Sequence, residues 1–196
     1  MIHRTAFVAF LGFLLAVGIA LGQTEIKLDD PQATYTHLMG FAFPSEVNGM
    51  PRIGLTRYDD GGKDISASYN HPSPKITATV YVYPAAVPHS KLESYLKEIA
   101  EYLAEAPGMK LLKIEAATIA LGEKKLAGFR ALFSVNEPHS LAAAVKGSAL
   151  SEFYLFPLEG NWHLKFRITY LVQDKEQAAP IIEKFINSFA LPDEKK

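Results

Sequence analysis

The sequence predicts an α+β domain: a mainly antiparallel sheet of about seven strands, with two amphipathic helices packed on it as a sandwich. Three observations predict this fold class. Several segments alternate between apolar and polar residues, turns of hairpin length join neighbouring segments, and apolar residues recur at helical spacing in two others. The expected order along the chain is strands, helix, strands, helix.

The chain starts with a segment typical of a secretory signal peptide. A basic opening with Arg4 precedes an apolar run at 6–21, and the small residues Ala20 and Gly22 favour cleavage between Gly22 and Gln23. The run is shorter than the roughly 20 apolar residues that cross a bilayer, so an uncleaved anchor is the less favoured alternative. We expect an exported protein, periplasmic or secreted, with no stable membrane span after cleavage.

Composition limits both the domain count and the chemistry. The 196 residues divide into a signal peptide at 1–22, a polar leader at 23–37, a single domain at 38–191 and a charged tail at 192–196. There is no cysteine, which excludes a lipid-anchoring cysteine, thiol catalysis, cysteine-based zinc sites and iron–sulfur clusters. The formal charge of −1 argues against nucleic acid as a partner.

The first half contains most of a meander and one helix. An apolar stretch at 38–43 stops at Pro44 and predicts a short first strand. Further strands are expected at 52–59, 64–70 and 76–83, the first two joined by the turn residues Gly61 and Gly62. The segment 76–83 is the clearest strand, because β-branched and aromatic residues alternate in it with period 2.

A helix should follow this meander. Ser90 and Glu93 have the spacing of a capping box, and Pro107 with Gly108 ends the helical pattern. Its apolar stripe consists of Leu92, Leu96, Ile99, Ala100 and Leu103.

The second half repeats the arrangement. Strands are predicted at 109–121, 126–135, 149–158 and 161–171, with a loop at 136–147. Glu159 and Gly160 form a hairpin turn between the last two strands. Asp174 is placed to cap a final helix. The stripe of that helix consists of Ala178, Ile182, Phe185, Ile186 and Phe189.

The element order resembles that of the PsbP-like and DcrB-like group of small exported α+β domains. The shared sequence feature is the opening Phe41-Ala42-Phe43-Pro44, and the resemblance covers most of 38–190. The Gly-Trp pair that often follows in that group is replaced here by Gly49-Met50. The resemblance implies an assembly or accessory role rather than catalysis, although fold similarity alone does not establish function.

Motifs for cofactors and catalysis are absent from the sequence. There is no Gly-x-Gly-x-x-Gly, no P-loop and no Gly-x-Ser-x-Gly around Ser148, so we expect no cofactor and no enzyme activity. The acidic segment 59–64 lacks the ligand spacing of a calcium loop and is interpreted as a hairpin turn. The mature histidines have no metal-binding spacing and are interpreted as unrelated: His37, His71, His89, His139 and His163.

Two surfaces are candidates for binding. The outward positions of the last strand, His163, Lys165 and Arg167, together with Arg130, form a basic stripe if their strands are neighbours. This stripe would meet an anionic partner, and a solvated sheet face with cross-strand charge pairs is the alternative.

The second candidate is an apolar groove. Its residues are Tyr81, Tyr83, Tyr154 and Phe156. The strand at 149–158 is apolar on both faces, which indicates either a central strand covered on both sides or a groove for a ligand.

Three functions follow from these patterns. The first is an exported non-enzymatic accessory protein that binds a protein or an envelope component. The second is a binder of a small apolar ligand between sheet and helix. The third is a hydrolase whose serine or carboxylate meets a histidine only in the folded state.

Overall fold

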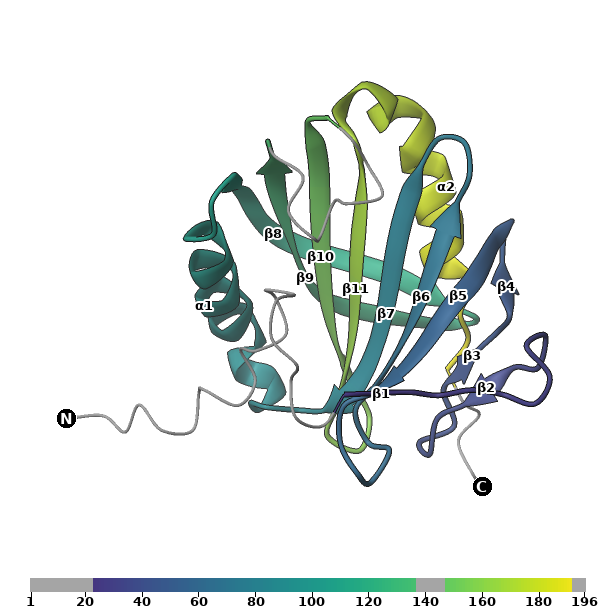
Figure 1. Cartoon of the computed structure of the whole chain (residues 1–196). Coiled ribbons are helices and arrows are strands. Elements are labelled where there is room, and N and C mark those ends of the chain that lie inside the picture. Colours follow the sequence, from purple (N-terminus) through teal and green to yellow (C-terminus); the bar gives the residue numbers. More distant parts are fainter. Residues whose placement is uncertain (1–22, 137–146, 192–196) are drawn as a thin grey trace.

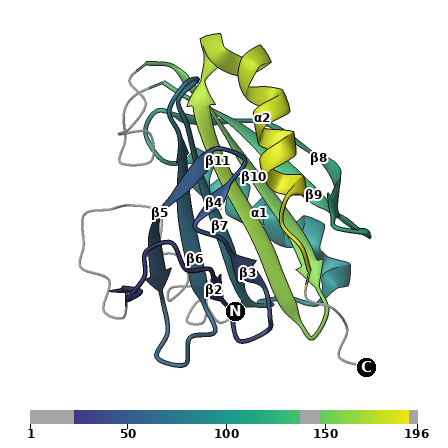
Figure 2. The same ribbon diagram turned by 90° about the vertical axis from the view of Figure 1, so that its right-hand side faces the viewer.

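The structure is a computed structural model that describes residues 23–136 and 147–191. A nine-stranded antiparallel sheet runs in the order β1-β5-β6-β7-β11-β10-β9-β8, and β4 pairs with β5 outside this path. Figures 1 and 2 show one helix on each side of this sheet. The α+β class predicted from the sequence is therefore confirmed, with more strands than expected.

The strands of the large sheet are β1 (Thr24–Glu25), β4 (Glu46–Val47), β5 (Met50–Arg57), β6 (Ile65–His71), β7 (Ile76–Pro84), β8 (Met109–Leu121), β9 (Lys124–Val135), β10 (Ala149–Leu158) and β11 (Trp162–Leu171). A separate two-stranded sheet joins β2 (Tyr35–Thr36) to β3 (Ala42–Phe43). The expected leader at 23–37 therefore contributes β1, which pairs with β5, and β2. The predicted signal peptide at 1–22, the predicted tail at 192–196 and most of the predicted loop, 137–146, lie outside the described residues.

The tight turns follow the predicted turn residues. Between β10 and β11, Gly160 and Asn161 have φ angles of 69° and 66°. Glycine and asparagine adopt positive φ values most easily, and the pairing of Leu158 with Trp162 leaves a three-residue loop at 159–161. This turn aligns β10 directly beside β11 from Ala149 to Leu158.

Helix α1 (Leu92–Ala104) follows a short 3₁₀ turn, η1 (His89–Lys91), and packs on β8, β9 and β10. Figure 1 shows it at the β8–β9 end of the sheet, away from β5 and β6. The predicted capping box is wrong: Ser90 lies inside η1, and the residue at the N-cap position, Lys91, makes no side-chain cap hydrogen bond. The extra turn moves the helix start past the serine.

Helix α2 (Lys175–Asn187) covers the opposite side of the sheet. Asp174 stands at its N-cap position as predicted, although its side chain makes no cap hydrogen bond. The core beneath α2 is strongly aromatic. The ring of Phe189 lies 5.2 to 6.0 Å from four other rings, those of Phe185, Phe166, Phe41 and Tyr69.

We call the two sides of the sheet the α1 face and the α2 face. The α1 face contains Tyr81, Phe133 and Phe153, and the α2 face contains Val80 and Phe166. Strand β10 contributes buried apolar residues to both faces, which confirms the prediction of a central strand covered on both sides.

Candidate functional site

The α1 face changes character from one half of the sheet to the other. Beneath α1, strands β9 and β10 present buried apolar side chains such as Phe133, Phe153 and Leu155. At the ends of β7 and β11, the helix contributes Tyr95, whose ring lies 5.9 Å from that of His163. Beyond that point, β6, β7 and β11 present hydroxyls and cations instead of an apolar surface.

The register places these polar residues in cross-strand rows. Tyr81 pairs with Ser66 on one side and with Lys165 on the other, and the next row joins Ser68, Thr79 and Arg167. A third row contains Asn70, Thr77 and Thr169, extended by Ser151 on β10. We call the following set the polar face: Ser66, Ser68, Thr77, Thr79, Tyr81, Lys165, Arg167 and Thr169.

Lys165 stands near the middle of the polar face. Its Nζ lies 4.0 Å from the centroid of the Tyr81 ring and 5.6 Å from that of Tyr83. Within the described part of the chain, its ammonium makes neither a hydrogen bond nor an ion pair. Burial lowers the pKa of Lys165 to about 8, and the Asp64 carboxylate opposes this shift.

Arg167 is the second cation of the polar face. Its guanidinium carbon lies 5.9 Å from the Phe153 ring centroid, and its side chain hydrogen-bonds that of Tyr81. Burial lowers the pKa of Arg167, while the neighbouring Tyr81 and Tyr58 oppose that shift. An arginine remains charged under these conditions.

Tyr58 and Asp64 border the polar face beside β6. The hydroxyls of Tyr58 and Ser66 are 2.8 Å apart, and the rings of Tyr58 and Tyr81 stack with centroids 6.4 Å apart. Asp64 is half-buried, and burial raises its pKa to about 6 despite the attraction of Lys165. The Asp64 carboxylate thus interacts electrostatically with Lys165 and with the neighbouring carboxylate of Asp59.

The structure corrects the prediction that His163 belongs to an outward-facing basic stripe. Its side chain is fully buried rather than outward-facing, and among the described residues neither ring nitrogen has a hydrogen-bond partner. The rings of Tyr83, Tyr95 and His89 surround it, because the segment containing η1 and α1 folds over this end of β11. Burial, followed by repulsion from His89, lowers the pKa of His163 to about 4.

Arg130 does not join the predicted basic stripe. It pairs with Tyr154 and Glu115 across the strands, which places it on the α2 face, whereas Lys165 and Arg167 lie on the α1 face. Its Nη2 lies 2.9 Å from Glu152, and its Nη1 lies 3.0 Å from Glu115.

Glu152 is the buried centre of this network and has no counterpart among the predicted site residues. Its carboxylate also accepts hydrogen bonds of 2.5 Å from Tyr154 and Tyr170. A charged residue inside an apolar strand is the sequence signal that could have identified it. The network satisfies a buried carboxylate with a cation and two hydroxyls, which is a structural role.

The predicted apolar groove is also divided by the sheet. Tyr81 and Tyr83 belong to the α1 face, and Tyr154 and Phe156 to the α2 face, where their rings stack 6.3 Å apart. Alternation along β7 and along β10 separates the two faces of each strand. It does not show which face of β7 lies on the same side of the sheet as a given face of β10, because that depends on how both strands pair with β11.

The remaining histidines do not converge on one site. His37 is buried, bonds the Lys63 carbonyl through Nε2 at 3.1 Å and lies edge-on to Trp162. His71 bonds the Pro74 carbonyl at 2.9 Å, and His139 lies outside the described residues. Across 23–136 and 147–191, no cluster of three or more potential metal ligands occurs.

The acidic turn and Ser148 show no sign of a site in the described structure. One carboxylate oxygen of Asp59 accepts hydrogen bonds from the backbone of Lys63 and Asp64, as expected for a turn between β5 and β6. Ser148 is exposed, and its carbonyl accepts a hydrogen bond from Val172. Asp59 thus closes a local turn, and the Ser148 carbonyl extends the pairing of β10 with β11 by one hydrogen bond.

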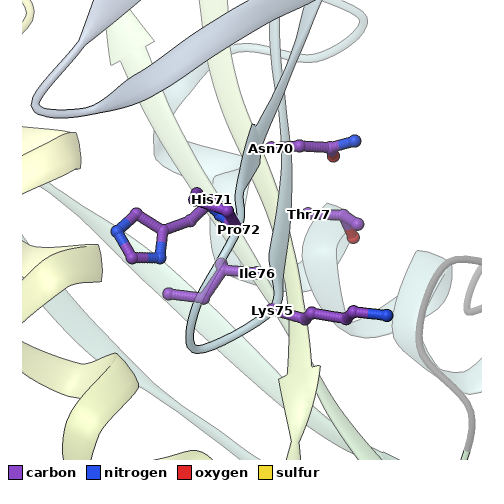
Figure 3. A pocket seen from close by; sticks show the side chains of 6 residues that line it. All are labelled: Asn70, His71, Pro72, Lys75, Ile76 and Thr77. Atoms are coloured by element: carbon purple, nitrogen blue, oxygen red, sulfur yellow. The ribbon is translucent and has the colours of Figure 1, made fainter.

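One pocket of about 250 Å³ lies at the β6–β7 turn (Figure 3). Asn70, Lys75 and Thr77 project to one side of the hairpin, whereas His71 and Ile76 project to the other. All its lining residues come from this single hairpin, and Thr77 is the one polar-face residue among them, so the pocket meets the polar face only at its edge.

Comparison with known proteins gives little further guidance. No protein-family model and no curated protein matches the sequence, so the resemblance to PsbP-like and DcrB-like domains is not confirmed. Among solved structures, the chain is similar to LpqN of Mycobacterium tuberculosis, which is described as involved in cell envelope biogenesis. The identity is 11%, the TM-score is 0.44, and the match covers 87% of this chain and 91% of LpqN. A similarity this distant does not inform function.

No helix in the described ranges is both long and apolar enough to cross a membrane.

Proposed function

We propose that the protein is an exported, non-enzymatic binding protein that holds its ligand on the polar face. The observation that carries this proposal is the change in the α1 face, from apolar beneath α1 to hydroxyl-rich and cationic over β6, β7 and β11. The signal-peptide pattern at 1–22 supports export.

A difference in free energy explains why a helix covers the apolar half of the α1 face and not the polar half. The helix buries an apolar surface, which stabilises the fold by roughly 25 cal/mol for each Å² removed from water. Half-buried polar side chains such as Ser68, Thr79 and Lys165 would gain little from such a cover, because burying polar groups without hydrogen-bond partners costs free energy. A wet surface that holds a ligand is consistent with this composition.

Binding is favoured over catalysis because the reactive residue types do not meet. In the part of the chain that the structure describes, no histidine nitrogen contacts a serine hydroxyl or a carboxylate. The apolar-ligand alternative has no specific support, since its four candidate residues lie on two faces.

Native mass spectrometry of the mature protein, isolated gently from its own host, tests the proposal. The blocking variant is Thr79→Trp, which fills the centre of the polar face, and the matched control is Thr118→Trp at an exposed position of β8. Wild type and control should carry an added small mass that Thr79→Trp lacks, at unchanged melting temperature.

A bare wild-type chain would contradict the proposal, as would an added mass that Thr79→Trp retains. A co-purified protein lost only in Thr79→Trp would assign the polar face to a protein partner instead.

A further inference from the structure

Building on the proposed function, we propose that the polar face binds a small ligand with one carboxylate and several hydroxyl groups, and that Lys165 anchors the carboxylate. Hydroxy acids and sugar acids have this chemistry.

Lys165 is positioned as an anchor. Cation–π contacts with Tyr81 and Tyr83 hold its ammonium on the face without consuming its three N–H donors. Its side chain is half-buried, so an anion that reaches it meets a partly dehydrated charge. A charge-assisted hydrogen bond is roughly twice as strong as a neutral one, which makes this group the strongest attachment point for a carboxylate.

The charge of the face favours one carboxylate over a dianion. In the described structure, Lys165 and Arg167 contribute two positive charges, while Asp64 interacts with Lys165 and is itself repelled by Asp59. Because these two carboxylates already lie near the cations, a ligand with a single carboxylate adds the least further negative charge. A phosphate monoester, which is close to a dianion at neutral pH, would leave an excess negative charge next to Asp64.

The rows of hydroxyls specify the rest of the ligand. The half-buried hydroxyls of Ser68 and Thr79 lie 3.5 Å apart beside the two cations, whereas Ser66 is buried and bonds Tyr58. A ligand with several hydroxyls can donate to and accept from Ser68 and Thr79, whereas a fatty acid would cover them with an alkyl chain that offers no hydrogen bond. Simple alkyl carboxylates are therefore expected to bind more weakly.

Isothermal titration calorimetry with three probes tests the proposal. Gluconate carries both the carboxylate and the hydroxyls, acetate carries only the carboxylate, and sorbitol carries only the hydroxyls. Gluconate should bind at least tenfold more tightly than either of the others. Inorganic phosphate, as a fourth probe, should bind more weakly than gluconate.

The variant pair is Lys165→Met, which keeps the length of the side chain, and Lys184→Met, which removes an exposed lysine on α2. Lys165→Met should weaken gluconate binding at least tenfold, and Lys184→Met should leave it within twofold. Circular dichroism and melting temperature confirm that both variants fold.

Two results would overturn the proposal: equal affinity for gluconate and sorbitol, or unchanged gluconate affinity in folded Lys165→Met. The carboxylate assignment can be wrong while the proposed binding function is right, and the two experiments distinguish these cases. If native mass spectrometry finds a neutral or cationic molecule that Thr79→Trp loses, the binding function stands and the carboxylate assignment is wrong.

Discussion

Tyr81 on β7 and Lys165 on β11 are direct cross-strand partners, and the ammonium of the lysine lies 4.0 Å from the centroid of the tyrosine ring. The pair marks the boundary on the α1 face between a helix-covered core and a polar surface. Because both residues sit on central strands of the sheet, their positions are fixed by the hydrogen bonds of the sheet rather than by a loop.

Removing the buried carboxylate of the α2 face should destabilise the protein. In Glu152→Gln, Arg130 loses its best charge partner, and Tyr154 and Tyr170 lose a charged acceptor. We expect a loss of roughly 3 kcal/mol in the free energy of unfolding, measured by urea denaturation. Lys97→Gln, which removes an exposed pair with Glu101, should cost less than about 0.5 kcal/mol. Equal effects would show that the Glu152 network contributes no special stability.

Glycine is required at position 128 because neighbouring atoms of β10 lie too close for a Cβ, and not because of its backbone conformation. A Cβ at this position would lie 2.2 Å from the Leu155 carbonyl oxygen and 2.5 Å from the Phe156 ring. Gly128→Ala should lower the free energy of unfolding by about 1 to 3 kcal/mol. Gly54→Ala is the control, since nothing lies within 4 Å of its added methyl group. Calorimetric melting should show a drop only for the first variant, and a native-like Gly128→Ala would contradict the strand packing.

The burial of His163 predicts a pH-dependent stability. Its pKa is lowered from 6.5 to about 4, so between these values the unfolded chain binds a proton that the folded chain does not. Stability is therefore complete above about pH 6.5 and decreases as the pH falls to about 4, by up to roughly 3 kcal/mol. Asp64 has a raised pKa and contributes with the opposite sign.

The difference between wild type and His163→Phe isolates this effect. The phenylalanine variant should lack the loss of stability attributable to His163, since the fit of the ring is kept and no proton is bound. His89→Gln, at an exposed position, should retain most of that loss. Denaturation midpoints between pH 4 and 7 measure it, and parallel curves for wild type and His163→Phe would refute the buried neutral imidazole.

The aromatic cluster beneath α2 should dominate stability. Phe189 is 2% exposed and contacts the rings of Phe185, Phe166, Phe41 and Tyr69. Phe189→Ala should cost about 3 to 5 kcal/mol in guanidinium denaturation. The control Tyr102→Ala, at a position that is 36% exposed, should cost less than 1 kcal/mol. Similar losses for both would mean that α2 is not docked by this cluster.

Local patterns in the sequence predicted the elements well. The strands at 76–83 and 149–158 agree with β7 (Ile76–Pro84) and β10 (Ala149–Leu158), because alternation and turn residues are local signals. The prediction that Ser90 caps α1 was wrong because Ser90 lies in the 3₁₀ turn η1. The local sequence pattern does not distinguish a residue in such a turn from an N-cap residue.

The candidate site was predicted only in part, since it depends on long-range pairing. Lys165 and Arg167 were identified from alternation on one strand, but their neighbours Ser66 and Ser68 come from β6, two strands away. Arg130 was misplaced because its polar-looking strand face turns towards the α2 core, where Glu152 compensates its charge. Sequence spacing contains no information about that register.

Amide chemical-shift mapping with gluconate is the decisive test of the polar face as the binding site, because it locates a binding surface residue by residue. We expect the largest shifts on β6, β7 and β11 around Ser66, Thr79 and Lys165, and Lys165→Met should abolish them. Shifts confined to the β6–β7 turn at His71, or to the outer surface of α2, would contradict the assignment of the polar face as the binding site.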